Sequence, residues 1–319
     1  MNCYQLPIVL KDMIKSLIFL TFLICSVVSQ AQQPENSKKV IKVLIVDGFS
    51  NHDWQQTTKV TRHILGKAGL FEVFVSTAPP DIDDEQWAEW QPEFTDYDVV
   101  IQNTNNINRQ EWRWPARVEK KLEDYVRNGG GLYILHSANN AFAHWEEYNR
   151  MIGLGWRKKE QGVALVIDEQ QKVVQIAKGE GKNTFHGDRY DAVIQLLDRH
   201  PIHKGFPNAW KTPNMELYKY ARGPAENLTV LSYSHDSVTR KSWPVEWIVN
   251  YGEGRVYNSS LGHLWKGEIY PDSYRCIGYQ TVLIRAVEWL ARENVTYKVP
   301  AGFPTRDTIS LVDDSISTD

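Results

Sequence analysis

Apolar segments of strand length alternate with segments of helical periodicity through the first 135 residues of this 319-residue chain, and no other feature restricts its fold as strongly. Helices are predicted at residues 55–68 and 118–126, where apolar side chains recur with helical spacing. Strands are predicted at residues 40–47, 71–76 and 98–103, and a further buried strand is predicted within residues 129–137. Repeated strand–helix–strand units are typical of a parallel sheet, so the sequence predicts an α/β fold with a mostly parallel central sheet.

The composition agrees with a folded domain and argues against one class of partner. Hydrophobic residues make up 42% of the chain and aromatic residues 12%, which is enough for a sizeable core. The formal net charge is −3 and the sequence has no basic run, whereas proteins that bind nucleic acid need clustered lysine and arginine to contact phosphates. We therefore expect no nucleic-acid partner.

The N-terminus has the features of a secretory signal peptide. Two lysines precede an apolar run at residues 17–25, and Ala31 supplies a small residue at a suitable cleavage position. The run is too short to favour a membrane span. We predict a signal peptide at residues 1–31, whose more ordinary start would be Met13, then a polar tether at residues 32–39, and a periplasmic or secreted location.

The second half of the chain departs from this alternation. Residues from about 156 to 225 are expected to fold over the sheet as an excursion, not as a separate domain. A hairpin is predicted at residues 245–261 and a closing amphipathic helix at residues 279–291. Shorter strands are predicted at residues 163–167, 173–176, 215–220 and 228–233. The domain should span residues 40–300, followed by a C-terminal tail at residues 301–319. Residues 304–319 are polar and are expected to be frayed.

Histidines follow several of the predicted strands. Three glycines at residues 129–131 allow a sharp turn into the strand that ends at His136. His52 follows the first predicted strand, and His263 follows the predicted hairpin. In open α/β sheets, ligands bind beyond the carboxyl ends of the strands, so these imidazoles are expected near a site. The alternative is that each histidine only makes structural hydrogen bonds.

Seven short motifs occur in an order that is typical of one protein family. They lie at residues 47–54, 129–142, 152–157, 200–202, 216–218, 222–227 and 251–263. Together they resemble the ThuA-like family, named for trehalose utilisation, which implies a class I glutamine amidotransferase-like fold, a flavodoxin-like α/β sandwich. His136 stands at the elbow where the amidotransferases carry a catalytic cysteine, and Ser137 beside it lacks a Gly-x-Ser-x-Gly frame. Neither an acyl-cysteine enzyme nor a serine hydrolase is therefore expected.

The resemblance implies a role in carbohydrate catabolism, with 3-keto-glycosides as substrates that a partner sugar 3-dehydrogenase produces. A keto group at C3 acidifies the proton at C2, so one acid–base pair could eliminate the substituent at the anomeric carbon and later add water. Such cleavage, by elimination or hydrolysis, needs no carboxylate pair of the glycosidase type. The alternatives are a carbohydrate-binding protein without catalytic activity and an accessory protein that scaffolds other sugar enzymes.

Four residues are predicted to form the catalytic site: His52, His136, Glu216 and His263, with His186 nearby. One interpretation is acid–base catalysis, in which one histidine takes the C2 proton and Glu216 or another histidine protonates the leaving oxygen. The other is a metal site, since three imidazoles and a carboxylate suit Zn²⁺ or a similar divalent ion. The histidines are dispersed without compact ligand spacing, which favours catalysis without a metal cofactor, although purely structural roles for the cluster stay open.

Further polar and aromatic residues near predicted strand ends are candidates for contacts with sugar hydroxyls or rings. They are Asp47, Asn51, Asn103, Ser137, Asn140, Trp145, His186 and Arg189. Asparagine and serine also cap helices and turns, so a structural role is the alternative for them. His200, His203 and Arg255 are interpreted as structural.

Overall fold

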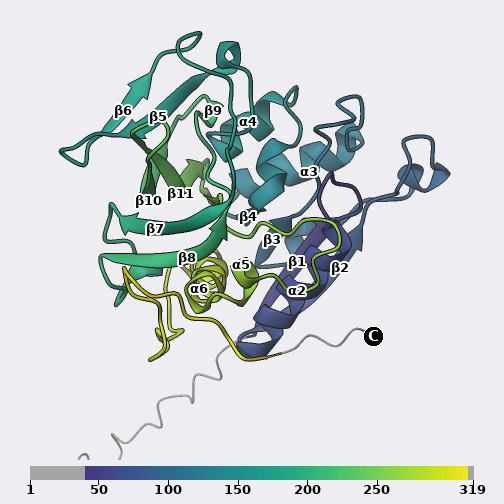
Figure 1. Ribbon diagram of the computed structural model, residues 1–319. Helices are drawn as coiled ribbons and strands as arrows, with labels where there is room; N and C mark the ends of the chain where they lie inside the picture. Colours follow the sequence, from purple (N-terminus) through teal and green to yellow (C-terminus); the bar gives the residue numbers. More distant parts are fainter. Residues whose placement is uncertain (1–39, 315–319) are drawn as a thin grey trace, which may run out of the picture. The chain divides into compact units, whose positions relative to one another are not determined.

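A mixed β-sheet forms the centre of residues 40–314, the part of the chain that the computed structural model describes (Figure 1). The strands follow the order β2-β1-β3-β4-β12-β11-β10-β7-β8 along the sheet, and β5, β6 and β9 branch from this path. The predicted signal peptide and tether, residues 1–39, lie outside the described residues, as do residues 315–319.

The first half of the sheet is parallel, as the alternation of strands and helices predicts. β1 pairs in parallel with β2 and β3, and β3 pairs in parallel with β4. The four strands are β1 (Ile41–Asp47), β2 (Phe71–Thr77), β3 (Val99–Gln102) and β4 (Gly131–Leu135). The helices are α2 (Trp54–Lys67), which begins where the side chain of Asp53 accepts a hydrogen bond from the backbone N–H of Gln56, and α3 (Ala116–Arg127). The α/β fold predicted from the sequence is confirmed.

The second half of the sheet is antiparallel beyond its junction with β4. β12 (Gly254–Ser259) pairs in parallel with β4 and forms the predicted hairpin with β11 (Lys241–Tyr251). Three antiparallel strands then complete the sheet: β10 (Leu228–Asp236), β7 (Tyr190–Leu196) and β8 (Ala209–Met215). The sheet is therefore mixed, with parallel strands at its core.

Two expectations for the middle of the chain need correction. The excursion expected at residues 156–225 extends the sheet, because β7 pairs with β10 and β8 pairs with β7 at the sheet's end. β5 (Val163–Ile167) pairs with β11, and β6 (Val173–Ile176) and β9 (Arg222–Gly223) each pair with β5. The strand predicted at residues 215–220 overlaps β8 only at Met215, where β8 ends. Glu216 therefore lies just beyond a strand.

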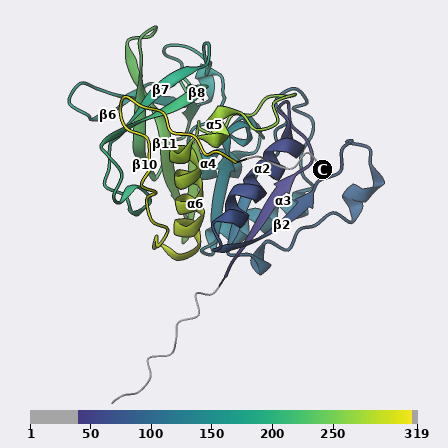
Figure 2. The ribbon, with the colours of Figure 1, turned by 60° about the horizontal axis from the view of Figure 1, so that its bottom comes forward.

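Helices cover both faces of the sheet. On one face, Val43 and Ile45 of β1 pack in one core cluster with Ile64 of α2 and Val282 of α6 (Ile277–Arg292). Figure 2 shows α2 and α6 together on this face. On the other face, the alternate β1 residues Leu44 and Val46 share a second core cluster with α3 and with α4 (Glu146–Ile152). This three-layer arrangement is the predicted sandwich.

Short helical turns occupy several connections. The chain leaves β4 in the 3-10 helix η3 (His136–Asn140), and the next helix, α4, begins at Glu146. A single turn, α5 (Asp272–Arg275), precedes α6. The other 3-10 helices of the described residues are η1 (Glu85–Ala88), η2 (Phe94–Asp96), η4 (Lys159–Gln161) and η5 (Pro201–His203).

The C-terminal tail packs against the domain as far as the structure describes it. The backbone N–H groups of Lys211 and Ile277 each donate a 2.9 Å hydrogen bond, to the carbonyls of Thr305 and Ser310. The predicted fraying is therefore wrong for residues 304–314, because backbone hydrogen bonds hold this polar segment against the domain. The composition of the segment could not reveal those bonds.

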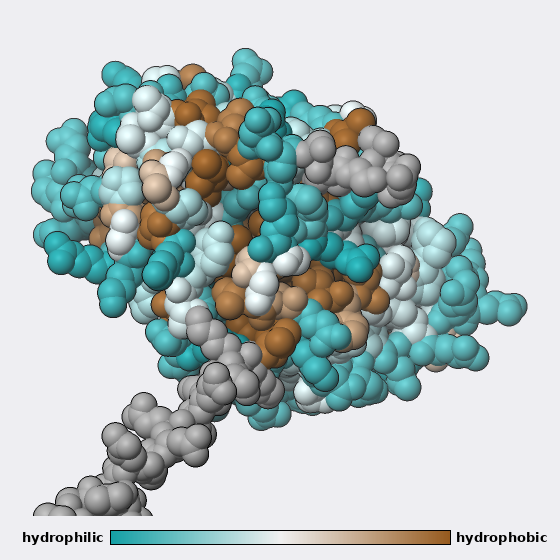
Figure 3. Space-filling view, turned by 90° about the horizontal axis from the view of Figure 1, so that it is seen from below, coloured by the Kyte–Doolittle hydropathy of each residue, from teal (hydrophilic) through white to brown (hydrophobic). Residues whose placement is uncertain are grey.

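The surface shows no continuous apolar face in the view from below, where hydrophobic residues form separate patches among hydrophilic ones (Figure 3). Much of the aromatic content lies inside, and Trp210, Trp243 and Trp247 are fully buried. Among residues 40–314, no helix is both long and apolar enough to cross a membrane.

Candidate functional site

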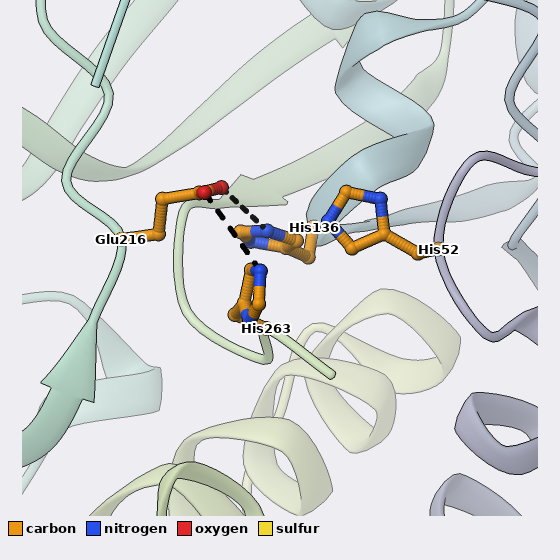
Figure 4. A group of neighbouring side chains, drawn as sticks. All are labelled: His52, His136, Glu216 and His263. Carbon is orange, nitrogen blue, oxygen red and sulfur yellow. Dashed lines mark ion pairs between the residues drawn. The ribbon is translucent and has the colours of Figure 1, made fainter. Parts of the chain in front are cut away.

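Four ionisable side chains meet where separate strands end (Figure 4). His52 follows β1, His136 follows β4, Glu216 follows β8 and His263 follows β12. One possible ligand atom from each residue lies within 4.8 Å of those from the other three. All four residues are buried, with exposed fractions between 2% and 8%. The structure thus brings together the four residues predicted for the site, which we call the His–Glu cluster.

His136 occupies a strained position at the end of β4. Its backbone φ is +38°, in the left-handed region that residues other than glycine rarely adopt. Its Nδ1 atom lies 3.0 Å from the backbone carbonyl of Ser260, which can only accept, so Nδ1 carries a proton. Its Nε2 atom lies 3.2 Å from the hydroxyl of Tyr218 and 3.2 Å from Oε2 of Glu216. A neutral His136 accepts from Tyr218, whereas a protonated His136 donates to Glu216.

His52 presents a free lone pair to the cluster. Its Nδ1 atom donates to Oδ1 of Asn51 at 2.9 Å, and Nδ2 of Asn105 donates to the same oxygen at 2.6 Å. Because Asn105 fixes the amide, the proton of His52 stays on Nδ1 and its Nε2 atom is left unprotonated. This Nε2 atom is buried and has no hydrogen-bond partner. Burial, and then the neighbouring His136 and His263, lowers the pKa of His52 to about 2, so its imidazole is neutral.

His263 presents the opposite tautomer. Arg189 donates to its Nδ1 atom at 3.1 Å and also to Oε1 of Glu268 at 2.9 Å. A guanidinium group can only donate, so Nδ1 of His263 accepts and the proton of the neutral ring lies on Nε2. That Nε2 atom is 3.7 Å from Oε1 of Glu216. Burial, and then the nearby His136, lowers the pKa of His263 to about 4.

Glu216 supplies the negative charge of the cluster. Burial by itself would raise the pKa of Glu216, but the hydrogen bond and charge of His136, together with His263 and His186, lower it to about 2. His186 reaches the same carboxylate from a more exposed position, with 3.4 Å between its Nε2 atom and Oε1. At neutral pH the site therefore holds a carboxylate surrounded by imidazoles.

The cluster also fits a divalent metal ion. Zinc with bonds of about 2.0–2.1 Å and tetrahedral geometry places its ligand atoms about 3.4 Å apart. Glu216 lies 3.2 Å from Nε2 of His136 and 3.7 Å from Nε2 of His263, and the unpartnered Nε2 of His52 completes the set. The dispersal of the histidines in the sequence, which favoured chemistry without a metal, carries little weight, because strand ends bring the ligands together. The cluster could hold a metal ion.

Three of the predicted substrate contacts have structural partners elsewhere. Asp47 accepts a 2.6 Å hydrogen bond from Thr58 of α2, and burial raises its pKa. Asn103 donates to the same Thr58 hydroxyl at 3.0 Å, so it ties the end of β3 to α2. Trp145 is only 3% exposed and donates to Glu123 at 2.8 Å. The prediction that Trp145 stacks on sugar is wrong, because its ring belongs to the hydrophobic core.

The other predicted contacts lie at or near the cluster. Asn51 and Arg189 orient cluster histidines, through the hydrogen bonds described above, and His186 contacts Glu216. Ser137 is buried, with its hydroxyl 3.5 Å from that of Ser50, which precedes Asn51. Asn140 is buried and its Oδ1 atom has no hydrogen-bond partner.

Sequence reasoning missed two aromatic neighbours of the cluster. The hydroxyl of Tyr218 is hydrogen-bonded to Nε2 of His136. This contact was not expected, because Tyr218 lies in a segment that was predicted to be a strand. Trp265 is 43% exposed, with its ring centroid 4.9 Å from that of His52 and stacked at 6.1 Å on that of His263. Its position two residues after His263 was the available signal, because a surface tryptophan beside a site histidine is a common sugar contact.

Three residues interpreted as structural have structural partners. His200 accepts from the backbone N–H of Ile202 at the start of η5. His203 contacts Glu246 at 3.1 Å inside the core. Arg255 forms an ion pair with Glu293 at 2.6 Å.

Comparisons with known proteins agree with this fold. The pattern of the ThuA family, described as trehalose utilisation, matches residues 42–290. The chain is also similar to a solved structure described as a ThuA-like protein from Parabacteroides merdae, with 32% identity and a TM-score of 0.80, over 86% of this chain and 98% of that one. No curated protein matches. The chain therefore belongs to the ThuA family, which is linked to trehalose utilisation.

Proposed function

We propose that this protein is a carbohydrate-active enzyme that cleaves 3-keto-glycosides by elimination or hydrolysis, with the His–Glu cluster as its catalytic centre. One observation carries the proposal: three imidazoles and a carboxylate from four strand ends lie within 4.8 Å of one another, and Nε2 of His52 is buried among them without a partner. An unpaired buried polar atom is costly, so a purely structural role explains it poorly. The family's link to trehalose utilisation supports a sugar substrate.

The proposed reaction gives the two outer histidines different roles. His52, whose Nε2 has a lone pair, takes the proton from C2 of the sugar. His263, whose Nε2 carries a proton, donates it to the leaving oxygen. The carboxylate of Glu216 lies within 4.8 Å of His52 and stabilises the positive charge that develops there, and the guanidinium of Arg189 stabilises the negative charge that develops on His263. His136 lies next to both histidines. The hydrogen bonds to Asn51 and Arg189 support this assignment, because they fix the two tautomers.

The proposed steps balance as follows. Removal of the C2 proton forms a double bond between C1 and C2 as the bond from C1 to the leaving oxygen breaks, and the leaving alcohol takes the proton of His263. The ketone at C3 delocalises the electron pair left at C2. Water then adds across the double bond, so that C2 regains a proton from His52 and His263 regains one from the water. The sum is a 3-keto-glycoside plus water giving a 3-keto sugar plus an alcohol.

A metal ion is compatible with the same centre. The imidazoles of His52, His136 and His263 and the carboxylate of Glu216 would hold it. Bound there, a divalent ion such as zinc would supply Lewis-acid polarisation of the C3 ketone. His263 would have to present its lone pair at Nε2, and Oε2 of Glu268, 4.0 Å from its Nδ1 atom, is the acceptor that could take the proton on the other side.

Incubation with a 3-keto disaccharide in D₂O tests the proposal. We expect release of the second sugar and deuterium at C2 of the keto sugar, because the C2 proton exchanges with solvent through His52. His52→Ala should abolish both, while the exposed His235→Ala should change neither. Loss of turnover with a chelator, restored by one metal, would establish the metal-dependent form. No turnover with or without added metals would overturn the enzyme proposal and favour a carbohydrate-binding protein without catalytic activity.

The proposed chemistry also implies a supplying reaction and a location. A 3-keto-glycoside must come from an oxidation at C3, so we propose a functional link to a sugar 3-dehydrogenase. The N-terminal pattern of lysines, apolar run and Ala31 supports export to the periplasm or beyond. Mass spectrometry of the mature protein purified from its native host tests the export, and an N-terminus still at residues 1–13 would contradict it.

A further inference from the structure

The His–Glu cluster is closed to solvent in the described conformation. Its four residues are between 2% and 8% exposed, and the unpartnered Nε2 atom of His52 is itself buried. Figure 4 shows the imidazole of His52 beside that of His136. A catalytic base has to come within about 2.6–3.2 Å of the atom from which it takes a proton. A sugar ring therefore reaches this nitrogen only after a neighbouring group has moved away.

Trp265 is the exposed neighbour of His52. The ring centroids of His136, His263 and Trp265 lie 5.4, 5.1 and 4.9 Å from that of His52. The two neighbouring histidines are buried, whereas Trp265 is 43% exposed. A side chain with few buried contacts is displaced at a low cost in free energy. Among these three rings, the indole of Trp265 is therefore the one that can open a path to His52.

The loop that carries Trp265 has an exposed tip on a fixed base. Leu264 is buried, whereas residues 265–267 are exposed. At the base, Gly262 has a φ of +87°, and a Cβ atom there would lie 2.5 Å from the hydroxyl of the buried Tyr279. In the tip, Gly267 has a φ of +86°, and no atom of residues 40–314 lies within 4 Å of a Cβ atom placed there. The base of the loop is thus packed against α6, and the turn at its tip lies in open space.

Side-chain hydrogen bonds hold this tip against the domain. Arg189 donates to Oε1 of Glu268 at 2.9 Å, and Oε2 of the same carboxylate accepts from the backbone N–H of Trp265 at 2.6 Å. Gln56 of α2 donates to the backbone carbonyl of Ile269 at 2.5 Å. These bonds lie at exposed positions, where water replaces them at a small net cost. The tip is therefore held by contacts that break without unfolding the domain.

We infer that Trp265 is the gate residue of the His–Glu cluster: its indole covers the ring of His52 in the described conformation and moves aside to admit the reacting sugar. The inference rests on the proposed function for what enters, a pyranose ring. The closure itself does not depend on that function, because any ligand that bonds to Nε2 of His52 needs the same opening.

The other exposed edge of the cluster leads to a different residue. His186 has a side chain that is 45% exposed, and its Nε2 atom lies 3.4 Å from Oε1 of Glu216. A ligand that entered beside His186 would meet this carboxylate first. Trp265 contacts His52 itself, so we assign the entrance to the proposed base to Trp265 and treat His186 as the competing position in the test.

Carbethoxylation with diethyl pyrocarbonate tests the gate without any turnover. The reagent modifies unprotonated imidazole nitrogens, and mass spectrometry resolves His52 from the exposed His235, because the two lie in separate tryptic peptides. In chelator-treated protein we expect His52 to react more slowly than His235. Trp265→Ala should speed the modification of His52 by at least about tenfold, because the protection given by the closed conformation is lost.

Two further variants separate the gate from a general loosening of the loop. Gln56→Ala removes one hydrogen bond of the tip and should speed the modification of His52 by a smaller factor, which keeps the test valid where Trp265→Ala fails to fold. Lys266→Ala changes the neighbouring exposed position of the same tip and is the matched control, so His52 should react in it as in the unaltered protein. The rate at His235 should be the same in every variant.

Several outcomes would overturn the gate. One is a rate at His52 as fast as that at His235 in the unaltered protein, because the cluster would then be open. Another is a rate at His52 that ignores Trp265→Ala and rises in His186→Ala, which would place the entrance beside Glu216.

The gate and the enzyme can fail separately. Faster modification of His52 in Trp265→Ala, without turnover of a 3-keto disaccharide by the unaltered protein, would support the gate and overturn the enzyme proposal. Turnover by the unaltered protein, with a rate at His52 that changes in neither Trp265→Ala nor Gln56→Ala, would support the enzyme and overturn the gate.

Discussion

The Nε2 atom of His136 lies 3.2 Å from Oε2 of Glu216, although β12, β11, β10 and β7 separate the strands that these two residues follow. Burial opposes the charge of Glu216, yet its imidazole neighbours lower its pKa to about 2. The pair therefore joins the parallel core of the sheet to its antiparallel end by an electrostatic contact. A change at either residue should affect the site more than the core.

Glu216→Gln tests this contact with almost no change of shape. We expect kcat on a 3-keto disaccharide to fall by about 10²- to 10⁴-fold, because the amide cannot stabilise a protonated imidazole. The far-ultraviolet circular dichroism and the melting temperature should change little. The matched control is Glu226→Gln, at an exposed position outside the cluster, which should keep full activity. Equal activity of the two variants would remove Glu216 from the mechanism.

The parallel half of the fold could be predicted because its signals are local. The strands at residues 41–47 and 99–102 are nearly continuous apolar runs, and α2 begins at an Asp53 cap. The antiparallel half was harder, because the pairing of β7 with β10 and of β8 with β7 depends on contacts between distant residues. The alternation of apolar and polar residues within one strand does not determine which other strand it pairs with.

The residues of the His–Glu cluster could be predicted from the sequence, but the tautomers of its histidines could not. Strand ends in an α/β sheet converge on one edge, so His52 and His136 were expected to meet. The tautomers were beyond sequence reasoning, because they depend on the amide of Asn105 and on Arg189, which lie 53 and 74 residues away along the chain from the histidines that they affect. Trp145 was predicted as a sugar contact, but its ring lies in the core. The sequence could not distinguish the two, because a tryptophan beside a site motif can pack in either place.

Zinc should stabilise the folded protein through the His–Glu cluster. A ligand present at about 100 times its Kd adds about 2.7 kcal/mol to the free energy of unfolding. We therefore expect a raised melting temperature when zinc is added to chelator-treated protein, and a saturable heat of binding in calorimetry. His52→Ala should lose both effects because its Nε2 completes the ligand set, while the exposed His235→Ala should keep them. An identical zinc response in both variants would place the ion elsewhere.

Arg189→Leu should remove the hydrogen bond that fixes the tautomer of His263 needed for the proposed reaction. Without the guanidinium, Nδ1 of His263 no longer has to accept, and the ring can place its proton toward Oε2 of Glu268, 4.0 Å away. We expect kcat without added metal to fall about 10- to 100-fold with little change in KM, as for other residues that orient a site histidine. Arg199→Leu, at an exposed position, is the matched control. A raised KM with unchanged kcat would instead make Arg189 a substrate contact.

Glu246 should make the stability of the fold sensitive to acid. Its carboxylate is fully buried and accepts from His203 at 3.1 Å and from Tyr257 at 2.6 Å. Burial opposes ionisation, but the charge and hydrogen bond of His203 lower the pKa of Glu246 below its ordinary 4.5. A group with a lowered pKa in the folded state contributes stability above its ordinary pKa, and this contribution is lost as the pH falls through the folded value.

Denaturant unfolding at pH 7 and at several values below 4.5 measures this contribution. Glu246→Gln should lower the free energy of unfolding at pH 7 by about 1–3 kcal/mol, because a buried amide cannot accept the hydrogen bonds of His203, Ser232 and Tyr257 as the carboxylate does. The variant should also lose less stability than the unaltered protein as the pH falls, since one carboxylate fewer has to be protonated. Glu226→Gln, on the surface, should leave both quantities unchanged. An acid dependence in Glu246→Gln as steep as in the unaltered protein would show that other carboxylates govern acid unfolding.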